Sequence, residues 1–255
     1  SPRSAIHLAT RARAGKGGKR ALPRCPGGGN VRSLGRPVRC RDCRMTDYAA
    51  AREAMVDRQV RPADVTLYPI IAAMLAVPRE AFVPDARRPV AYLGEHVPLA
   101  PGRVLLDPRV FAKLLDALDV GTGDLVLDLG CGLGYSAAVL ARMADAVVAV
   151  EPDPERLLGR HAVDNAVVQA GPLEAGVAEH GPFDVVILEG GIELLPPAIE
   201  EQLKVGGRIA AIFMQGAGGQ ARLGLRTPQG ITWRRIFDAT APVLPGFAAV
   251  KAFEF

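Results

Sequence analysis

The chain has 255 residues, of which 49% are hydrophobic and 23% charged, and its formal net charge is +4. These proportions are typical of a globular protein, and four cysteines are too few for a disulfide-rich scaffold, so we expect a reducing compartment. No apolar run approaches the roughly 20 residues that a membrane helix needs, so we expect no membrane contact.

The basic charge is concentrated in the first 44 residues. This segment contains 12 Lys or Arg and one acid, Asp42, a net charge of +11, which leaves −7 for residues 45–255. It is rich in Gly, Pro and Ser and lacks hydrophobic periodicity. Met45 then opens a sequence that looks like an ordinary protein start. We expect residues 1–44 to be a disordered tail or a start-site or cloning artefact. A nucleic-acid-binding arm is the alternative that we do not favour.

The next part of the chain predicts helices and loops. Helices are expected over residues 49–59 and 66–75, and residues 84–103 read as a loop-rich stretch. Pro108 can occupy the first turn of a helix that runs to Leu118.

The most informative run is Leu-Asp-Leu-Gly-Cys-Gly-Leu-Gly-Tyr at 127–135. It follows the apolar run 125–127 and precedes a helix-like stretch at 137–141, and a second apolar run, 146–150, ends on Glu151. This order of strand, glycine turn, helix, strand and acid suits a nucleotide-like ligand. Glycines let the backbone approach the ligand, the helix N-terminus offers free N–H groups, and the distal acid can hydrogen-bond a ribose diol.

The glycine spacing is G-x-G-x-G, which differs from the G-x-G-x-x-G of dinucleotide sites. An NAD site is therefore the next alternative, and a turn that binds nothing is the third. The run resembles motif I of class I S-adenosylmethionine-dependent methyltransferases, in which one acid lies near the amino-acid moiety and a second holds the ribose. Asp128 and Glu151 match these two positions. The resemblance implies S-adenosyl-L-methionine as cofactor, held by Asp128, Gly130, Cys131, Gly132, Gly134, Tyr135, Glu151, Pro152 and Gly171.

Strands and helices alternate after the glycine motif. A helix is expected at 196–203, ended by Gly206 and Gly207. Strands are expected at 183–188, 208–213, 233–237 and 248–255. This alternation predicts an α/β fold of the Rossmann-like class, with a mostly parallel sheet that has helices on both faces, and ligands at the carboxyl ends of the strands.

Several stretches together resemble the protein-L-isoaspartate O-methyltransferase family. The most specific is Val-Pro-Arg-Glu-x-Phe-Val-Pro at 77–84; the others are at 55–59, 132–141, 182–184 and 196–208. The resemblance implies a cytoplasmic methyltransferase with a seven-stranded sheet, acting as a monomer in protein repair by methylating isoaspartyl residues of damaged proteins or peptides. Residues 45–107 would then form a helical, substrate-side segment and residues 108–255 the cofactor-binding sheet.

The acceptor site departs from the family pattern. The family has Thr-Ile-Ser-Gln-Pro where this chain has Val-Leu-Leu-Asp-Pro at 104–108. Leu106 cannot donate a hydrogen bond to a carboxylate, and Asp107 adds a negative charge. These departures leave two alternatives open, an S-adenosylmethionine-dependent methyltransferase with another acceptor and a non-catalytic family member.

Three further features bear on the site. The family's Gly-Asp-Gly, which contacts adenine, is replaced by Gly171-Pro172-Leu173. Glu189 stands where the family has small or hydroxyl residues, and it either faces the substrate site or solvates a strand end. His96 should flank the substrate channel as a structural residue. We expect no metal site, since the Cys-x-x-Cys at 40–43 lacks well-placed partners.

Overall fold

The computed structural model describes residues 47–153 and 164–249, all within a compact unit of residues 44–255. The expectations for residues 1–44 and for most of the strand at 248–255 lie outside the described ranges; residues 248 and 249 are described and form no strand. Across these ranges, none of the helices is both long and apolar enough to cross a membrane.

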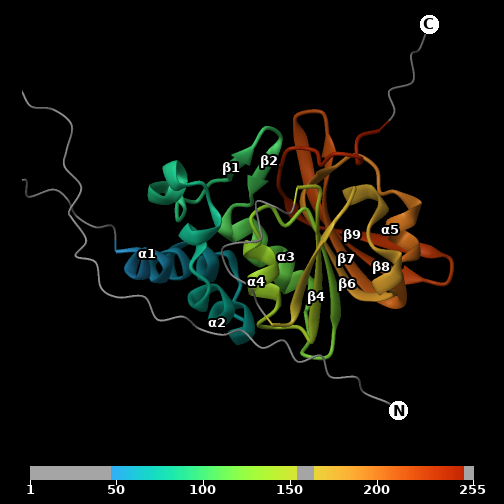
Figure 1. The fold of residues 1–255 in the computed structure, drawn as a ribbon, viewed down its shortest axis with the longest axis horizontal. Coiled ribbons are helices and arrows are strands. Elements are labelled where there is room, and N and C mark those ends of the chain that lie inside the picture. Colours follow the sequence, from blue (N-terminus) through green and yellow to red (C-terminus); the bar gives the residue numbers. More distant parts are fainter. Residues whose placement is uncertain (1–46, 154–163, 250–255) are drawn as a thin grey trace, which may run out of the picture. The chain divides into compact units, whose positions relative to one another are not determined.

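A seven-stranded sheet forms the centre of the fold, in the order β5-β4-β3-β6-β7-β8-β9 (Figure 1). The first five strands of this order are parallel to their neighbours, and β8 and β9 are antiparallel additions at one edge. The strands are β3 Leu125–Leu129, β4 Ala146–Glu151, β5 Ala166–Ala170, β6 Phe183–Ile192, β7 Leu203–Gln215, β8 Gly218–Thr227 and β9 Gly230–Asp238. The predicted Rossmann-like class is therefore confirmed.

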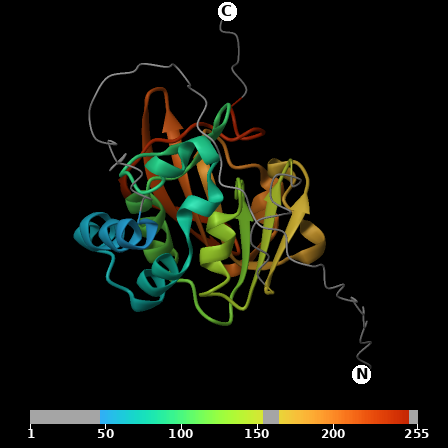
Figure 2. The ribbon, with the colours of Figure 1, turned by 60° about the vertical axis from the view of Figure 1, so that its left-hand side comes forward.

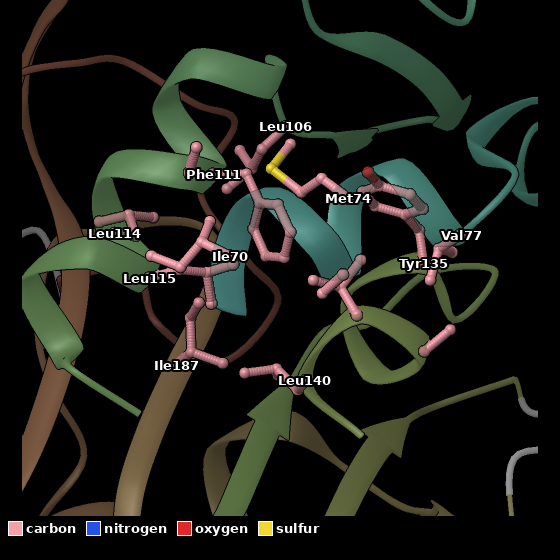
Figure 3. Packing of buried hydrophobic residues seen from close by; sticks show 14 of the residues in the cluster. Ile70, Met74, Val77, Leu106, Phe111, Leu114, Leu115, Tyr135, Leu140 and Ile187 are labelled. Carbon is pink, nitrogen blue, oxygen red and sulfur yellow. The ribbon is translucent and has the colours of Figure 1, made fainter. Parts of the chain in front are cut away.

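Helices cover both faces of the sheet, because alternate residues of the central strands point to opposite sides. One face packs against α3 and α4, with α2 on these two helices and α1 beside α2, and the other face packs against α5 (Figure 1 and Figure 2). The helices are α1 Tyr48–Met55, α2 Tyr68–Ala76, α3 Pro108–Leu118, α4 Tyr135–Leu140 and α5 Pro197–Glu201. Figure 3 shows the first of these interfaces, where Met74 of α2 and Phe111 of α3 meet Leu106.

A small hairpin, β1 Val97–Ala100 with β2 Arg103–Leu105, lies outside the main sheet. Short helical turns precede it and others follow the later strands: η1 Val56–Val60, η2 Arg61–Ala63, η3 Arg79–Phe82, η4 Asp85–Val90, η6 Leu173–Ala175 and η7 Ala178–His180. The hairpin falls in the stretch that was expected to be loop-rich, and it brings β2 against the cofactor turn.

The structure corrects two boundaries. The helix expected at 196–203 ends at Glu201, and Gly206 and Gly207, expected to end it, lie inside β7. The first residue of β7, Leu203, already lies opposite Phe183 of β6. This pairing makes β7 start before the two glycines. The helix expected at 49–59 leaves α-helical geometry after Met55 and continues as a π-helical turn.

Candidate functional site

The glycine turn joins β3 to α4 at the carboxyl edge of the sheet. Gly130, Gly132 and Gly134 have φ values of +84°, +61° and +89°, in the left-handed region that side chains disfavour. The Gly130 N–H donates to Val150 O at 3.0 Å, which anchors the turn to β4. The turn therefore brings the predicted glycines together beside the end of β4, where Glu151 lies.

Asp128 is fully buried directly before this turn. Its Oδ2 accepts a hydrogen bond of 2.6 Å from the Ser136 hydroxyl, while Oδ1 has no partner. Burial raises the pKa of Asp128 to about 7. The negative charge of Glu151 also raises this pKa, whereas the hydrogen bond from Ser136 lowers it. A buried carboxylate oxygen without a partner suits a cationic ligand group. The acid was predicted from sequence, whereas Ser136 was missed, although a hydroxyl in the first turn of the following helix is a usable signal.

Glu151 is bound by a residue that the sequence did not single out. Arg103 of β2 donates to both carboxylate oxygens, at 2.9 Å to Oε1 and 2.7 Å to Oε2. The Gly132 N–H donates to Oε2 at 2.9 Å. Three of the roughly four acceptor positions of this carboxylate are therefore filled. A ribose diol donates two hydrogen bonds, so one of the three bonds that Glu151 now accepts would have to be released.

The β1–β2 hairpin also covers the glycine turn. Leu99 Cδ1 would lie 2.5 Å from a Cβ atom placed on Gly132, and Arg103 Nη2 would lie 3.2 Å from one on Gly130. Leu173 Cδ1 and Leu244 Cδ2 would lie 3.6 and 3.3 Å from the same added Cβ atom on Gly130. The turn is thus enclosed by apolar side chains and one guanidinium.

The remaining predicted cofactor residues differ in what they offer. The Gly171 N–H donates to Glu151 O at 3.4 Å, so Gly171 lies beside Glu151, and Pro152 is exposed at the end of β4. Cys131 is buried, and burial raises the pKa of its thiol, which argues against a nucleophile. The Tyr135 ring packs between Phe82 and Phe111, in the core shown in Figure 3, so its side chain faces away from the turn.

Pro172 precedes the short turn η6, at the position where the family has an acid. Glu174, the nearest acid in sequence, leans against Gly246, where its Oε2 would lie 2.2 Å from an added Cβ atom. The apolar Leu173 and Leu244 therefore form the wall next to Gly130 in place of a polar contact.

The acceptor-site residues have clear structural roles. Leu106 is fully buried in the core beside Met74 (Figure 3). Asp107 is the N-cap of α3, and its Oδ1 accepts hydrogen bonds from Arg109 N at 2.7 Å and Val110 N at 3.4 Å. Such a cap stabilises a helix by about 0.5–2 kcal/mol. The Asp107 carboxylate is therefore directed to the helix end, where the helix dipole favours its charge.

His96 fastens the start of α3 to the chain after β9. The Asp107 N–H donates to His96 Nδ1 at 2.8 Å, and Nε2 lies 2.7 Å from Thr240 O. This pair of contacts requires the proton on Nε2. The structural role predicted for His96 is in keeping with this arrangement.

An open cleft of about 830 Å³ lies between the start of α3 and the β7–β8 hairpin. Its polar lining carries both signs of charge and includes Glu95, His96, Asp107, Arg109, Arg222 and Asp238. The cleft adjoins the predicted acceptor segment and has room for several residues of a peptide. No group of three His, Cys, Asp or Glu side chains suited to a metal ion occurs within residues 47–153 and 164–249.

Comparison with known proteins identifies the family of this chain. The family model described as protein-L-isoaspartate(D-aspartate) O-methyltransferase matches residues 50–221. A protein-L-isoaspartate O-methyltransferase of Methylorubrum extorquens is 37% identical over 196 residues, which cover 75% of this chain and 86% of the relative. A protein-L-isoaspartate O-methyltransferase of Rhodopseudomonas palustris is 34% identical over 170 residues, which cover 64% of this chain and 69% of the relative.

A solved protein-L-isoaspartate O-methyltransferase superimposes with a TM-score of 0.65 at 23% identity, covering 76% of this chain and 66% of that one, and shows the same fold. The sequence match spans both the glycine turn and the Val-Pro-Arg-Glu-x-Phe-Val-Pro run. The chain therefore belongs to the protein-L-isoaspartate O-methyltransferase family.

Proposed function

We propose that this protein methylates the isoaspartyl carboxylate of damaged proteins or peptides, with S-adenosyl-L-methionine as donor. The observation that carries the proposal is the enclosed glycine turn with a buried, unpartnered Asp128 oxygen, in a chain whose relatives bear the name of this activity. We also propose that it acts as a cytoplasmic monomer that requires no nucleic acid.

The chemistry demands little of the protein beyond positioning. When bound, S-adenosylmethionine supplies a methyl group on a positively charged sulfur. A carboxylate oxygen of the acceptor would bond to the methyl carbon as the carbon–sulfur bond breaks, which would give a methyl ester and a neutral thioether. The acceptor is already ionised at neutral pH, so no strong general base is needed. Alignment and the exclusion of water then provide most of the rate.

The described residues can divide this work. Asp128 would accept the cationic end of the cofactor, Glu151 the ribose diol, and Leu173 with Leu244 would enclose its apolar parts. The cleft beside Asp107 would receive the peptide, so the acceptor would approach from the α3 side.

Labelled methyl transfer by the full chain tests the proposal. An isoaspartyl peptide and its aspartyl twin are compared, and we expect label in the isoaspartyl peptide alone. Equal labelling of both, or of neither at high enzyme concentration, contradicts the proposed acceptor. Cofactor affinity measured in parallel separates a wrong acceptor from a protein that binds no cofactor.

Cofactor affinity should depend on pH through Asp128. Because its pKa is raised to about 7 in the free protein, the carboxyl must lose a proton before it can pair with a cation. We expect the affinity for S-adenosylmethionine to fall roughly tenfold between about pH 8 and pH 6. Calorimetry in two buffers of different ionisation enthalpy should show proton release. Asp128→Asn should bind more weakly and lose the pH dependence, and an unchanged pH dependence in that variant would assign it to another group.

Removing the Arg103 side chain should favour the cofactor. Since Arg103 occupies both oxygens of Glu151, the ribose diol must displace it. We expect Arg103→Gln to bind S-adenosylmethionine about tenfold more tightly and to melt at a lower temperature without ligand, because it loses a partly buried ion pair. Arg61→Gln, which removes an exposed pair with Asp57, is the matched control. Weaker binding by Arg103→Gln would mean that Arg103 holds Glu151 in place for the ribose.

A further inference from the structure

Glu189 is a buried acid that the mechanism above does not use. It follows Leu188 of β6, which lies opposite Leu129 of β3, so it stands level with the start of the glycine turn. Only 4% of the residue is exposed, and its Oε1 has no hydrogen-bond partner. A buried polar atom without a partner is costly, which points to a ligand that completes the bonding.

A second unpartnered group lies on the acceptor side of Glu189. Arg79 of η3 is fully buried, and its Nη2 donates to Leu106 O at 2.6 Å, next to Asp107. Its Nη1 makes no hydrogen bond of accepted geometry, although the guanidinium interacts with the Tyr135 hydroxyl, and its charge acts on Glu189. One donor and one carboxyl group are therefore left unsatisfied between the cofactor turn and the acceptor segment.

The environment disfavours the ionised form of the Glu189 carboxyl group. Burial raises its pKa well above the ordinary value, the charge of Asp128 adds to this effect, and Arg79 and Arg103 oppose it. The charged or titratable side chains that interact with it come from five segments, and they are Arg79, Arg103, Asp128, Cys131 and Tyr135. A protonated carboxyl group in an apolar site can donate a strong hydrogen bond to an anion.

We propose that protonated Glu189 donates a hydrogen bond to the acceptor carboxylate and so supplies the contact that Leu106 cannot make. Arg79 Nη1 is the neighbouring donor on the same anion. This inference rests on the proposed function, because it assumes a carboxylate acceptor. It makes Glu189 a residue that recognises the acceptor, and the proton stays on Glu189 throughout the methyl transfer.

Steady-state kinetics of the full chain with an isoaspartyl peptide, at saturating S-adenosylmethionine, test the inference. Glu189→Ala should raise KM for the peptide by about 10-fold to 150-fold, with a much smaller change in kcat and in cofactor affinity. Glu189→Gln keeps a donor of the same size, and its kcat/KM should stay within about fivefold of the wild type at neutral pH. Glu179→Gln removes an exposed acid and should change nothing. Thermal melts of every variant establish that it is folded.

The pH profile separates recognition from a structural role. Wild-type kcat/KM should fall as the pH is raised far enough for Glu189 to lose its proton, and the Gln variant should lack this fall. An unchanged KM in Glu189→Ala, or a faster Glu189→Gln, overturns the inference, since a faster Gln variant means that ionised Glu189 repels the acceptor.

Failure of the proposed function gives a different pattern. If the wild type transfers no methyl group, binding of the isoaspartyl peptide to protein saturated with S-adenosylhomocysteine replaces the kinetics. Binding that is retained in Glu189→Gln and lost in Glu189→Ala then supports the donor without the activity. Absence of peptide binding by the wild type overturns both proposals.

Discussion

Gly132→Val is expected to reduce the affinity for S-adenosylmethionine by about 100-fold or more, equivalent to about 2.7 kcal/mol. Gly132 has a φ of +61°, which is strained for any β-branched residue. A Cβ atom there would also lie 2.5 Å from Leu99 Cδ1, so the Leu99 side chain would have to move. The Gly132 N–H would then no longer be held on Glu151, and the turn would lose the geometry that accommodates the cofactor.

Isothermal titration of the full chain measures this loss. Gly123→Val is the matched control, because an added Cβ atom there meets nothing within 4 Å and its φ is not in the left-handed region. The control should bind as the wild type does. Comparable binding by Gly132→Val, with an unchanged melting temperature, would show that the cofactor does not use this turn.

The glycine turn is also where the sequence was most informative. Three glycines, two acids and two apolar runs at fixed spacing allow few structures, and β3, α4 and β4 formed where they were expected. The reason is local, since backbone conformation and strand order are encoded within about 25 residues at this point.

Arg103 could not be predicted in the same way. It contacts Glu151 across 48 positions of sequence, and the contact depends on how the β1–β2 hairpin folds back. Nothing in the stretch around it distinguishes a loop from a hairpin, because Pro98 and Pro101 interrupt any strand-like alternation. Tertiary packing decided that geometry.

Asp107 shows a different limit. The family's pattern assigned it to the acceptor segment, and its charge suggested repulsion of a carboxylate substrate. The structure adds that the carboxylate caps α3, directly before Pro108 at the first helical position. An acid at the N-cap position can be recognised from sequence once the start of the helix is assumed. The sequence therefore contained the signal for this cap, but the comparison with the family's pattern led to the acceptor-site interpretation.

The other large effect is expected at Arg79, the buried arginine in the Val-Pro-Arg-Glu-x-Phe-Val-Pro run. Its guanidinium donates from Nε to Ala91 O at 2.7 Å and from Nη2 to Leu106 O at 2.6 Å. It also lies over the Tyr135 ring, 5.0 Å from its centre. One side chain thus connects η3 to the end of η4 and to the residue before the α3 cap.

Arg79→Met should lower the free energy of unfolding by about 3–5 kcal/mol. Methionine fills much of the same volume but donates no hydrogen bond, so two buried carbonyl groups lose their partners. Ala91 and Leu106 are both fully buried, which prevents water from replacing the guanidinium. A loss of this size is a large fraction of the stability of a typical domain.

Chemical denaturation of the wild type, Arg79→Met and Arg79→Lys measures the effect. Lysine restores the charge without the planar fork that reaches two carbonyl groups at once, so it should recover only part of the loss. Arg61→Met, at an exposed surface pair, should change the stability by less than about 0.5 kcal/mol. If Arg79→Met were as stable as the wild type, the two carbonyl contacts would contribute nothing net. The specific run at 77–84 would then be explained by the role in acceptor recognition that we propose for Arg79.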